Sequence, residues 1–184
     1  MKKLAIILPG VGYHTDKPLL YYSKKIAKAK DYQIIEISYN FTDDVGKIKF
    51  DEDSMSKAID IGLKQMEEQL SDLEFSSYDR IVFIGKSIGT AIAARYDITH
   101  DISGEHIVFT PVPATFDYLT STQGLVFHGS MDPLCDTDLC VENCEEMSLT
   151  YAVVPQANHS LETGDVLTDI DNLQRLMKTV EKIL

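Results

Sequence analysis

The sequence predicts an α/β fold: an open, mostly parallel sheet of about six strands with helices on both faces. Short aliphatic runs alternate along the chain with longer polar stretches in which apolar residues recur every three to four positions. Most of the runs are apolar throughout, which is typical of parallel strands that helices cover on both sides. Because crossovers between parallel strands are right-handed, this order indicates a twisted open sheet that binds ligands at the carboxyl edge of its strands.

Each element of this fold is assigned from its own stretch of sequence. The predicted strands are residues 4–8, 33–37, 80–84, 106–110, 124–127 and 149–154. The predicted helices are residues 18–30, 54–72, 88–96, 138–147 and 165–184. Pro18 favours a helix start, because the amide that proline lacks would have no partner in a first turn. The polar connection at residues 38–53 is expected to be a solvated loop, with a mobile rim over a pocket as the alternative.

Length and composition indicate one domain, residues 1–184, with an apolar core and no lid domain. The chain is 44% hydrophobic and 25% charged, and a chain of this length buries about 70% of the surface that it exposes when unfolded. Its 29 acidic and 17 basic residues give a net charge of -12, which disfavours nucleic acid and anionic membrane surfaces as partners. No apolar stretch approaches the roughly 18 residues that span a bilayer, so we expect no membrane segment.

The N-terminal region and the cysteines predict a cytoplasmic protein. The apolar run at residues 4–8 is shorter than the roughly 7 to 15 residues of an export signal's apolar core. An odd number of cysteines in one short segment, Cys135, Cys140 and Cys144, argues against a disulfide framework. These cysteines also lack the paired C-x-x-C spacing of common metal sites, so we expect no metal.

The predicted strand at residues 80–84 runs directly into G-K-S-I-G at residues 85–89, and a predicted helix follows. In this context G-x-S-x-G places the serine on a strained turn that exposes its hydroxyl, and the glycines avoid collisions with neighbouring backbone. Ser87 is therefore the predicted nucleophile, with a tight turn and a capping serine as the alternative. Lys86, the residue before it, is expected to point to the surface.

A serine nucleophile needs a base that takes its proton and a carboxylate that orients the base. Asp132 and His159 each follow a predicted strand further along the chain. Because the carboxyl ends of parallel strands meet at one edge of a sheet, both should come close to Ser87. The sequence thus predicts the triad Ser87, Asp132 and His159, and we expect His128 beside it to make structural hydrogen bonds.

The oxyanion that forms on an attacked carbonyl needs two N–H donors. The amide of Ile88, directly after the nucleophile, is predicted to supply one. We assign the second to Val11, in a turn whose glycines let the backbone approach a substrate closely. Four neighbours in or beside this turn are predicted to bind substrate: Gly10, Gly12, Tyr13 and His14. A packed tyrosine and a surface histidine are equally compatible roles for the last two.

Four motifs together resemble the α/β-hydrolase superfamily, and specifically its small lidless members, such as minimal bacterial lipases and dienelactone-hydrolase-like proteins. These motifs are P-G-V-G-Y at residues 9–13, G-K-S-I-G at 85–89, H-G-S-M-D at 128–132 and N-H-S-L-E at 158–162. The resemblance covers nearly the whole chain in element order. It implies the α/β-hydrolase fold, with Ser87 as nucleophile, His159 as base and Asp132 as its partner. The chain departs from the pattern at Pro9, where histidine is common.

These residues predict a serine hydrolase that cleaves a small carboxylic ester or thioester through an acyl-enzyme on Ser87. The expected partner is the small-molecule substrate alone, without nucleic acid, membrane or cofactor. A peptidase or an acyltransferase with the same triad is one alternative, because one fold supports many reactions. A hydrolase-like protein that binds a small molecule or a partner without turnover is the alternative from another class.

Overall fold

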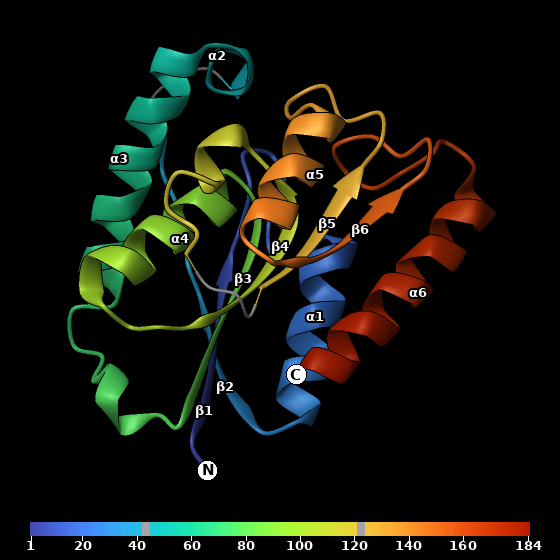
Figure 1. The fold of residues 1–184 in the computed structure, drawn as a ribbon. Helices are drawn as coiled ribbons and strands as arrows, with labels where there is room; N and C mark the ends of the chain where they lie inside the picture. The colour runs from blue at the N-terminus through green and yellow to red at the C-terminus, as the bar shows by residue number, and fades with distance from the viewer. Residues whose placement is uncertain (42–44, 121–123) are drawn as a thin grey trace.

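The computed structural model describes residues 1–41, 45–120 and 124–184 of the chain. The strands of these residues form one sheet in the order β2-β1-β3-β4-β5-β6, with every neighbouring pair parallel. The strands are β1 (Lys3–Leu8), β2 (Tyr32–Glu36), β3 (Arg80–Ser87), β4 (Glu105–Pro111), β5 (Gly124–Gly129) and β6 (Thr150–Val154). The helices are α1 (Pro18–Ala29), α2 (Val45–Phe50), α3 (Glu52–Gln69), α4 (Ile88–His100), α5 (Thr137–Glu146) and α6 (Val166–Ile183). The predicted open α/β sheet is confirmed (Figure 1).

Strand β1 illustrates why helices cover both faces of the sheet. Ala5 and Ile7 belong to one apolar cluster, whereas Leu4, Ile6 and Leu8 belong to another. All five side chains are fully buried. Successive side chains of a strand point to opposite faces, so a strand that is apolar throughout needs a helical layer on each side. Helices α1 and α6 cover the first face, and α3 and α4 cover the second (Figure 1).

The edge strands β2 and β6 are less buried than the central strands. Tyr32 is the buried residue of β2, and Val154 is the buried residue of β6. Tyr151 of β6 is exposed. An edge strand has one neighbour and lies at the margin of the helical layers, so part of its surface faces solvent. The central strands β3, β4 and β5, in contrast, are buried through their last residues.

The connection at residues 38–53 contains helix α2, so the expectation of a simple solvated loop is wrong. The Ile48 side chain of α2 is fully buried in the same apolar cluster as residues of α3. This burial holds the segment against the rest of the protein. The Asp51 carboxylate then accepts a hydrogen bond from the Ser54 amide at 2.8 Å and starts α3 at Glu52. Residues 42–44 of this connection lie outside the described residues.

Local capping explains where several helices begin. Pro18 opens α1, as predicted. Asp136 and Asp165 accept hydrogen bonds from amides in the first turns of α5 and α6. Helix α4 continues past the predicted end to His100. Within the described parts of the chain, no helix combines the length and the apolar character that a bilayer crossing requires.

Candidate active site

Ser87 lies at the junction of β3 and α4, where the chain turns sharply. Its φ of 57° and ψ of -128° are values that residues other than glycine rarely adopt, and they persist only where the surrounding structure enforces them. A Cβ atom at Gly89 would lie 2.5 Å from the Pro9 carbonyl oxygen. Only glycine therefore lets the end of β1 and the start of α4 approach this closely. The turn has the geometry that the G-x-S-x-G motif predicts.

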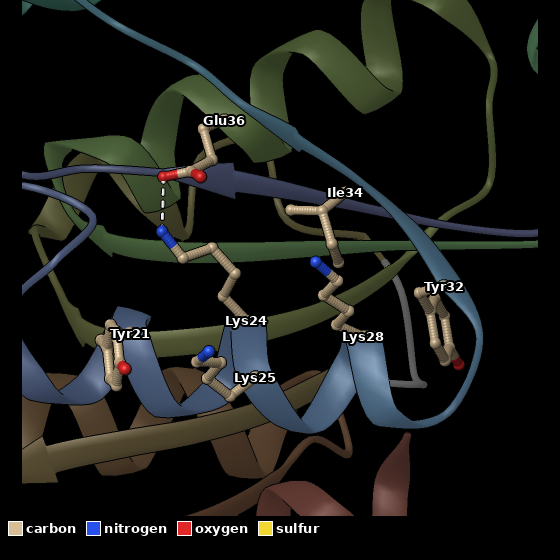
Figure 2. Close-up of a pocket in the computed structure, with 7 residues that line it drawn as sticks. All are labelled: Tyr21, Lys24, Lys25, Lys28, Tyr32, Ile34 and Glu36. Carbon is tan, nitrogen blue, oxygen red and sulfur yellow. Dashed lines mark hydrogen bonds and ion pairs between the residues drawn. The ribbon is translucent and has the colours of Figure 1, made fainter.

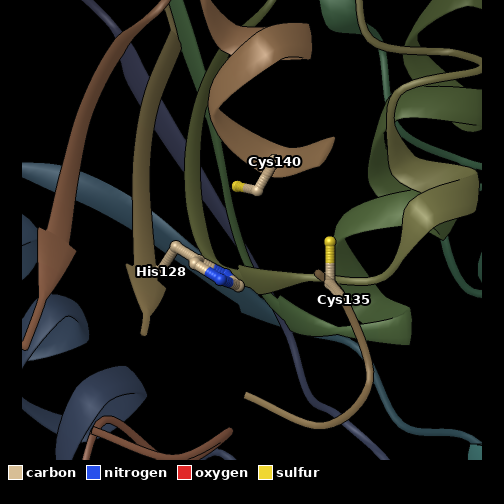
Figure 3. A group of neighbouring side chains, drawn as sticks. All are labelled: His128, Cys135 and Cys140. Atoms are coloured by element: carbon tan, nitrogen blue, oxygen red, sulfur yellow. The ribbon is translucent and has the colours of Figure 1, made fainter. Parts of the chain in front are cut away.

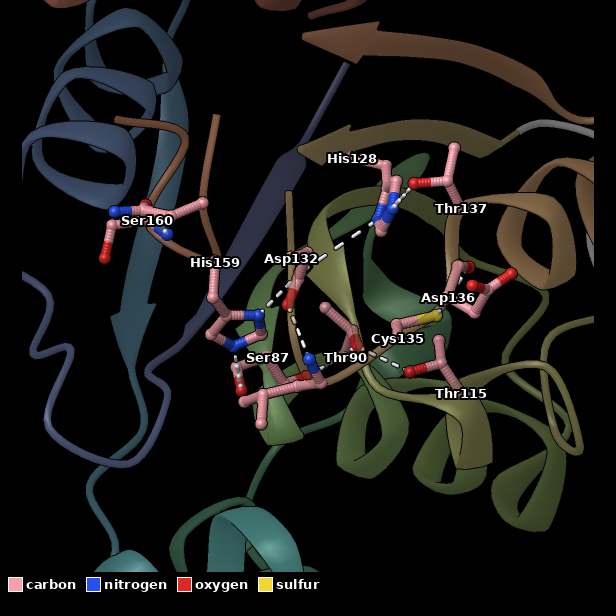
Figure 4. Close-up of polar contacts among 12 residues, drawn as sticks. Ser87, Thr90, Thr115, His128, Asp132, Cys135, Asp136, Thr137, His159 and Ser160 are labelled. Carbon is pink, nitrogen blue, oxygen red and sulfur yellow. Dashed lines mark hydrogen bonds and ion pairs between the residues drawn. The ribbon is translucent and has the colours of Figure 1, made fainter. Parts of the chain in front are cut away.

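The side chains of Ser87, Asp132 and His159 form one hydrogen-bonded chain, as Figure 4 shows. His159 Nδ1 lies 2.7 Å from Asp132 Oδ2, and His159 Nε2 lies 2.8 Å from Ser87 Oγ. An ionised carboxylate can only accept, so Nδ1–H donates to Asp132 and Nε2 accepts from the Ser87 hydroxyl. The structure therefore brings together three predicted residues that are up to 72 positions apart in the sequence.

The three side chains differ in their access to solvent. The Asp132 side chain is fully buried, while that of His159 is 16% exposed. Ser87 is 5% exposed. Asp132 Oδ1 accepts a hydrogen bond from the Leu134 amide at 2.9 Å, so both carboxylate oxygens have donors. The negative charge is thus shielded from water and directed at the imidazole, where it has its largest electrostatic effect.

Backbone hydrogen bonds join the loops that carry Asp132 and His159. The Ser130 amide donates to the Val154 carbonyl at 3.0 Å, and the Met131 amide donates to the Ala157 carbonyl at 2.9 Å. The loop after β5 and the loop after β6 are therefore fixed to each other. This connection sets the distance between the carboxylate and the imidazole.

The turn after β1 lies directly against Ser87. The backbones of Gly10 and Tyr13 pair through two hydrogen bonds of 3.0 and 3.1 Å, which leave the Val11 amide outside the pair. A Cβ atom at Gly10 would lie 3.0 Å from Ser87 Cβ, so glycine permits this close approach. Ile88 is the first residue of α4, and the first amides of a helix have no acceptor within it. Of the two predicted oxyanion donors, Ile88 directly follows Ser87, and Val11 directly follows the glycine that approaches Ser87.

The predicted substrate-binding residues have different surroundings. Tyr13 is buried, its hydroxyl accepts a hydrogen bond from the Leu19 amide at 3.1 Å, and burial raises its pKa to about 12. Tyr13 is therefore a neutral, packed residue. His14 is exposed, and its Nδ1 accepts from the Asp16 amide at 3.3 Å. Gly12 is exposed and has a φ of 74°, which glycine adopts without strain.

Lys86 is buried, so the expectation of a surface-pointing lysine is wrong. It is 1% exposed, and its Nζ lies 5.1 Å from the centre of the Tyr13 ring. The physical reason is its position in β3, which pairs with β1 on one side and β4 on the other beneath helices on both faces. A cation thus lies inside the protein next to Ser87, and the face of an aromatic ring contributes to its stabilisation.

Two cavities lie beside the loops that carry Asp132 and His159, and neither is lined by Ser87, Asp132 or His159 themselves. One of about 460 Å³ lies beside the His159 loop and is lined in part by Tyr13, Asn158 and Ser160. The other, of about 650 Å³, lies beside the Asp132 loop and is lined in part by Pro133 and Leu134. Both volumes are within the range of small-molecule sites.

A further cavity of about 440 Å³ lies between α1 and β2 and contains none of the predicted site residues (Figure 2). Three lysines of α1 line it: Lys24, Lys25 and Lys28. Lys24 pairs with Glu36 at 2.8 Å and with Asp16 at 3.4 Å. The local acidic groups therefore offset part of the positive charge.

Two threonines that the sequence motifs did not indicate support the turn at Ser87. The Thr90 hydroxyl donates to the Ser87 carbonyl at 2.6 Å and lies 2.7 Å from the Thr115 hydroxyl. Both residues are buried. Thr90 could have been identified from the sequence, because a hydroxyl in a helix can donate to the carbonyl three residues before it. Thr115 could not have been identified in this way, since it lies in the segment after β4 and reaches Thr90 only in the folded protein.

No protein-family model and no curated protein matches this chain. Solved structures do match it. Est1E from Butyrivibrio proteoclasticus, in a structure with ferulic acid bound, has a TM-score of 0.67 at 13% identity over 98% of this chain and 87% of that one. A lidless α/β serine hydrolase from Xanthomonas campestris has a TM-score of 0.63 at 16% identity over 98% and 82%. The Bacillus cereus carboxylesterase has a TM-score of 0.61 at 16% identity over 100% and 89%.

The alignments with these structural neighbours cover nearly the whole of this chain, at identities too low to carry more than the fold. The sequence-based expectation of fold is confirmed by them. The chain has the α/β-hydrolase fold in its small form.

Proposed function

We propose that this protein is a serine hydrolase that cleaves a small carboxylic ester or thioester through an acyl-enzyme on Ser87. The observation that carries the proposal is the continuous hydrogen-bonded chain from Asp132 through His159 to Ser87. Nucleophilic catalysis by serine requires these three groups in this order and within hydrogen-bond reach of one another.

In the acylation step, Ser87 Oγ bonds to the substrate carbonyl carbon while His159 Nε2 takes the hydroxyl proton. The negative charge moves to the carbonyl oxygen, for which the amides of Val11 and Ile88 are the proposed donors. Collapse of the tetrahedral intermediate breaks the bond to the leaving group, which receives the proton from His159. Asp132 stabilises the imidazolium that forms during these transfers.

In the deacylation step, a water molecule takes the place of the leaving group. His159 removes one proton from this water as its oxygen bonds to the acyl carbon, and then returns the proton to Ser87 Oγ. The carboxylic acid leaves and the free enzyme is restored. Every proton in this cycle passes through His159 Nε2, so no metal or organic cofactor takes part in the proposed steps.

Two observations support carboxylic esters as the first substrate class to test. The neighbour from Bacillus cereus is a carboxylesterase, and Est1E was observed with ferulic acid bound. Thioesters belong to the same proposal, because the serine attacks the same carbonyl carbon and a thiolate leaves readily.

The decisive test is activity-based labelling together with a substrate panel. We expect a fluorophosphonate probe to label one serine per chain, and Ser87→Ala to abolish that labelling. We also expect the variant to lower hydrolysis of short-chain p-nitrophenyl esters by more than about 10³-fold. Ser71→Ala, which changes an exposed serine after α3, is the matched control and should behave as the unmodified chain.

The panel contains esters, thioesters and amides of graded acyl length, with and without an alcohol acceptor. Preferential cleavage of amides would instead make the protein a peptidase, and transfer to the alcohol would make it an acyltransferase. A folded protein that the probe does not label, and that turns over none of these substrates, would contradict the hydrolase proposal and favour binding without turnover.

A further inference from the structure

A second group of reactive side chains lies outside the chain of Ser87, His159 and Asp132, where the end of β5 meets the start of α5. His128, Cys135 and Cys140 each offer one ligand atom, and these three atoms lie within 4.8 Å of one another. None of the three residues is more than 2% exposed. Figure 3 shows the two thiols and the imidazole directed toward a common space.

His128 has one engaged and one vacant ring nitrogen. Its Nε2 lies 3.0 Å from Thr137 Oγ1, and its buried Nδ1 has no hydrogen-bond partner among the described residues. The Asp132 carboxylate is 4.0 Å from Nδ1, which is beyond hydrogen-bond distance. When Nε2–H donates to the threonine, Nδ1 retains a lone pair. Histidines that bind metals have this arrangement, with one nitrogen fixed by a hydrogen bond and the other on the ion.

The two cysteines supply soft donors from independent elements. All three cysteines of the chain are free thiols. Cys140 lies in the first half of α5, and Cys135 lies in the loop before that helix. They belong to an apolar cluster that includes Val126 of β5, so no water-exposed group competes for them there. Cys144, one helical turn after Cys140, has its sulfur in contact with that of Cys140.

We propose that His128, Cys135 and Cys140 bind one Zn²⁺ ion. Donor atoms at 2.0 to 2.3 Å from a common zinc are about 3.3 to 3.8 Å apart. Side-chain shifts of about 1 Å would therefore close the observed cluster around an ion. Each thiol releases its proton as its sulfur binds, so two protons leave and two zinc–sulfur bonds form.

The charges of the site favour this ion over the alternatives. Two thiolates, one neutral imidazole and one Zn²⁺ have no net charge, which is the condition under which burial costs least. A monovalent copper ion would leave one uncompensated negative charge beside the buried Asp132 carboxylate. Mg²⁺ and Ca²⁺ prefer oxygen ligands and more of them. Sequence spacing did not indicate the site, because His128 joins it only through the packing of β5 against α5.

The test is zinc binding by the full chain, with no measurement of turnover. Protein stripped of metal by a chelator under reducing conditions is titrated with Zn²⁺ in competition with a chromophoric chelator. We expect one ion per chain with a Kd below about 1 μM. Co²⁺ at the same site should produce thiolate-to-metal absorption in the near ultraviolet. At a hundredfold excess over Kd, Zn²⁺ should raise Tm by about 5 to 10 °C.

Variants separate this site from surface binding. Cys140→Ala and Cys135→Ser should each weaken Zn²⁺ binding by at least about 100-fold and remove the rise in Tm. His100→Gln is the matched control, because His100 is an exposed histidine 3.5 Å from Glu67, and it should bind Zn²⁺ as the unmodified chain does. Absence of stoichiometric binding, or undiminished binding by both cysteine variants, would overturn the assignment.

Discussion

At the scale of single residues, the Asp132 carboxylate has a hydrogen-bond donor on each of its oxygens. Its side chain is buried, one carboxylate oxygen faces His159 at 2.7 Å, and the other accepts the Leu134 amide at 2.9 Å. An acid in such a position holds the imidazole in one tautomer, with the proton on Nδ1 and the lone pair on Nε2. The role of Asp132 can therefore be tested separately from its contribution to folding.

We expect Asp132→Asn to lower kcat by about 10³ to 10⁴-fold and to leave the fold intact. The amide group of asparagine can donate to Nδ1, which favours a proton on Nε2 and prevents His159 from taking the Ser87 proton. Steady-state kinetics on the best ester and a thermal melt measure the two effects. Asp136→Asn is the control, because Asp136 caps α5 and should retain kcat. Equal kcat in Asp132→Asn and the unmodified chain would contradict the proposed role.

Because Lys86 is buried, we expect its replacement to change the free energy of unfolding. Lys86 is 1% exposed, so its methylene groups are removed from water. Lys86→Ala removes these buried groups and should lower the free energy of unfolding by about 2 to 4 kcal/mol. Lys86→Met refills the apolar volume without the charge over Tyr13, so its effect should be smaller. Urea titrations compare the three proteins, and a change below about 0.5 kcal/mol for Lys86→Ala would indicate a surface position instead.

At the scale of secondary structure, the cap of α6 is a local feature with a predictable pH dependence. Asp165 accepts a hydrogen bond from the Thr168 amide at 2.9 Å, and this bond lowers the pKa of the Asp165 carboxyl. A carboxyl whose pKa is lower in the folded state stabilises the fold above its pKa in the unfolded chain. That stabilisation is lost as pH falls through the lower, folded-state value.

We therefore expect Asp165→Ala to lower Tm at neutral pH, and the difference from the unmodified chain to shrink below about pH 4. Thermal melts at a series of pH values measure both trends. Asp171→Ala changes an exposed aspartate further along the same helix and should leave Tm nearly unchanged. A Tm difference that stays constant from neutral to acidic pH would show that the cap does not act through its charge.

The elements that could be predicted are those that a short stretch of sequence determines by itself. The central strands are recognisable because they are apolar on both faces, and α1 because Pro18 opens it. Helix α2 could not be predicted, since its six residues are held by burial of Ile48 rather than by helical periodicity. Short helices depend on tertiary packing, which a sequence pattern does not contain.

At the scale of the whole molecule, the predicted convergence of Ser87, Asp132 and His159 followed from topology. Parallel strands end at the same edge, so residues just after them could be expected to meet. The burial of Lys86 and the approach of His128 to Cys135 could not be predicted this way. Both depend on which strands become neighbours and on how a helix packs across them, and these contacts join distant parts of the sequence.

The position of β1 in the interior of the sheet has a kinetic consequence. The first strand pairs with β3, and Lys3 lies beside Arg80 in that register. Such pairings close long loops and form slowly, and the bond between Ser87 and His159 requires the last strand as well. In a refolding experiment, probe labelling of Ser87 should therefore recover later than far-ultraviolet circular dichroism. Recovery of probe labelling at Ser87 would then mark the end of folding.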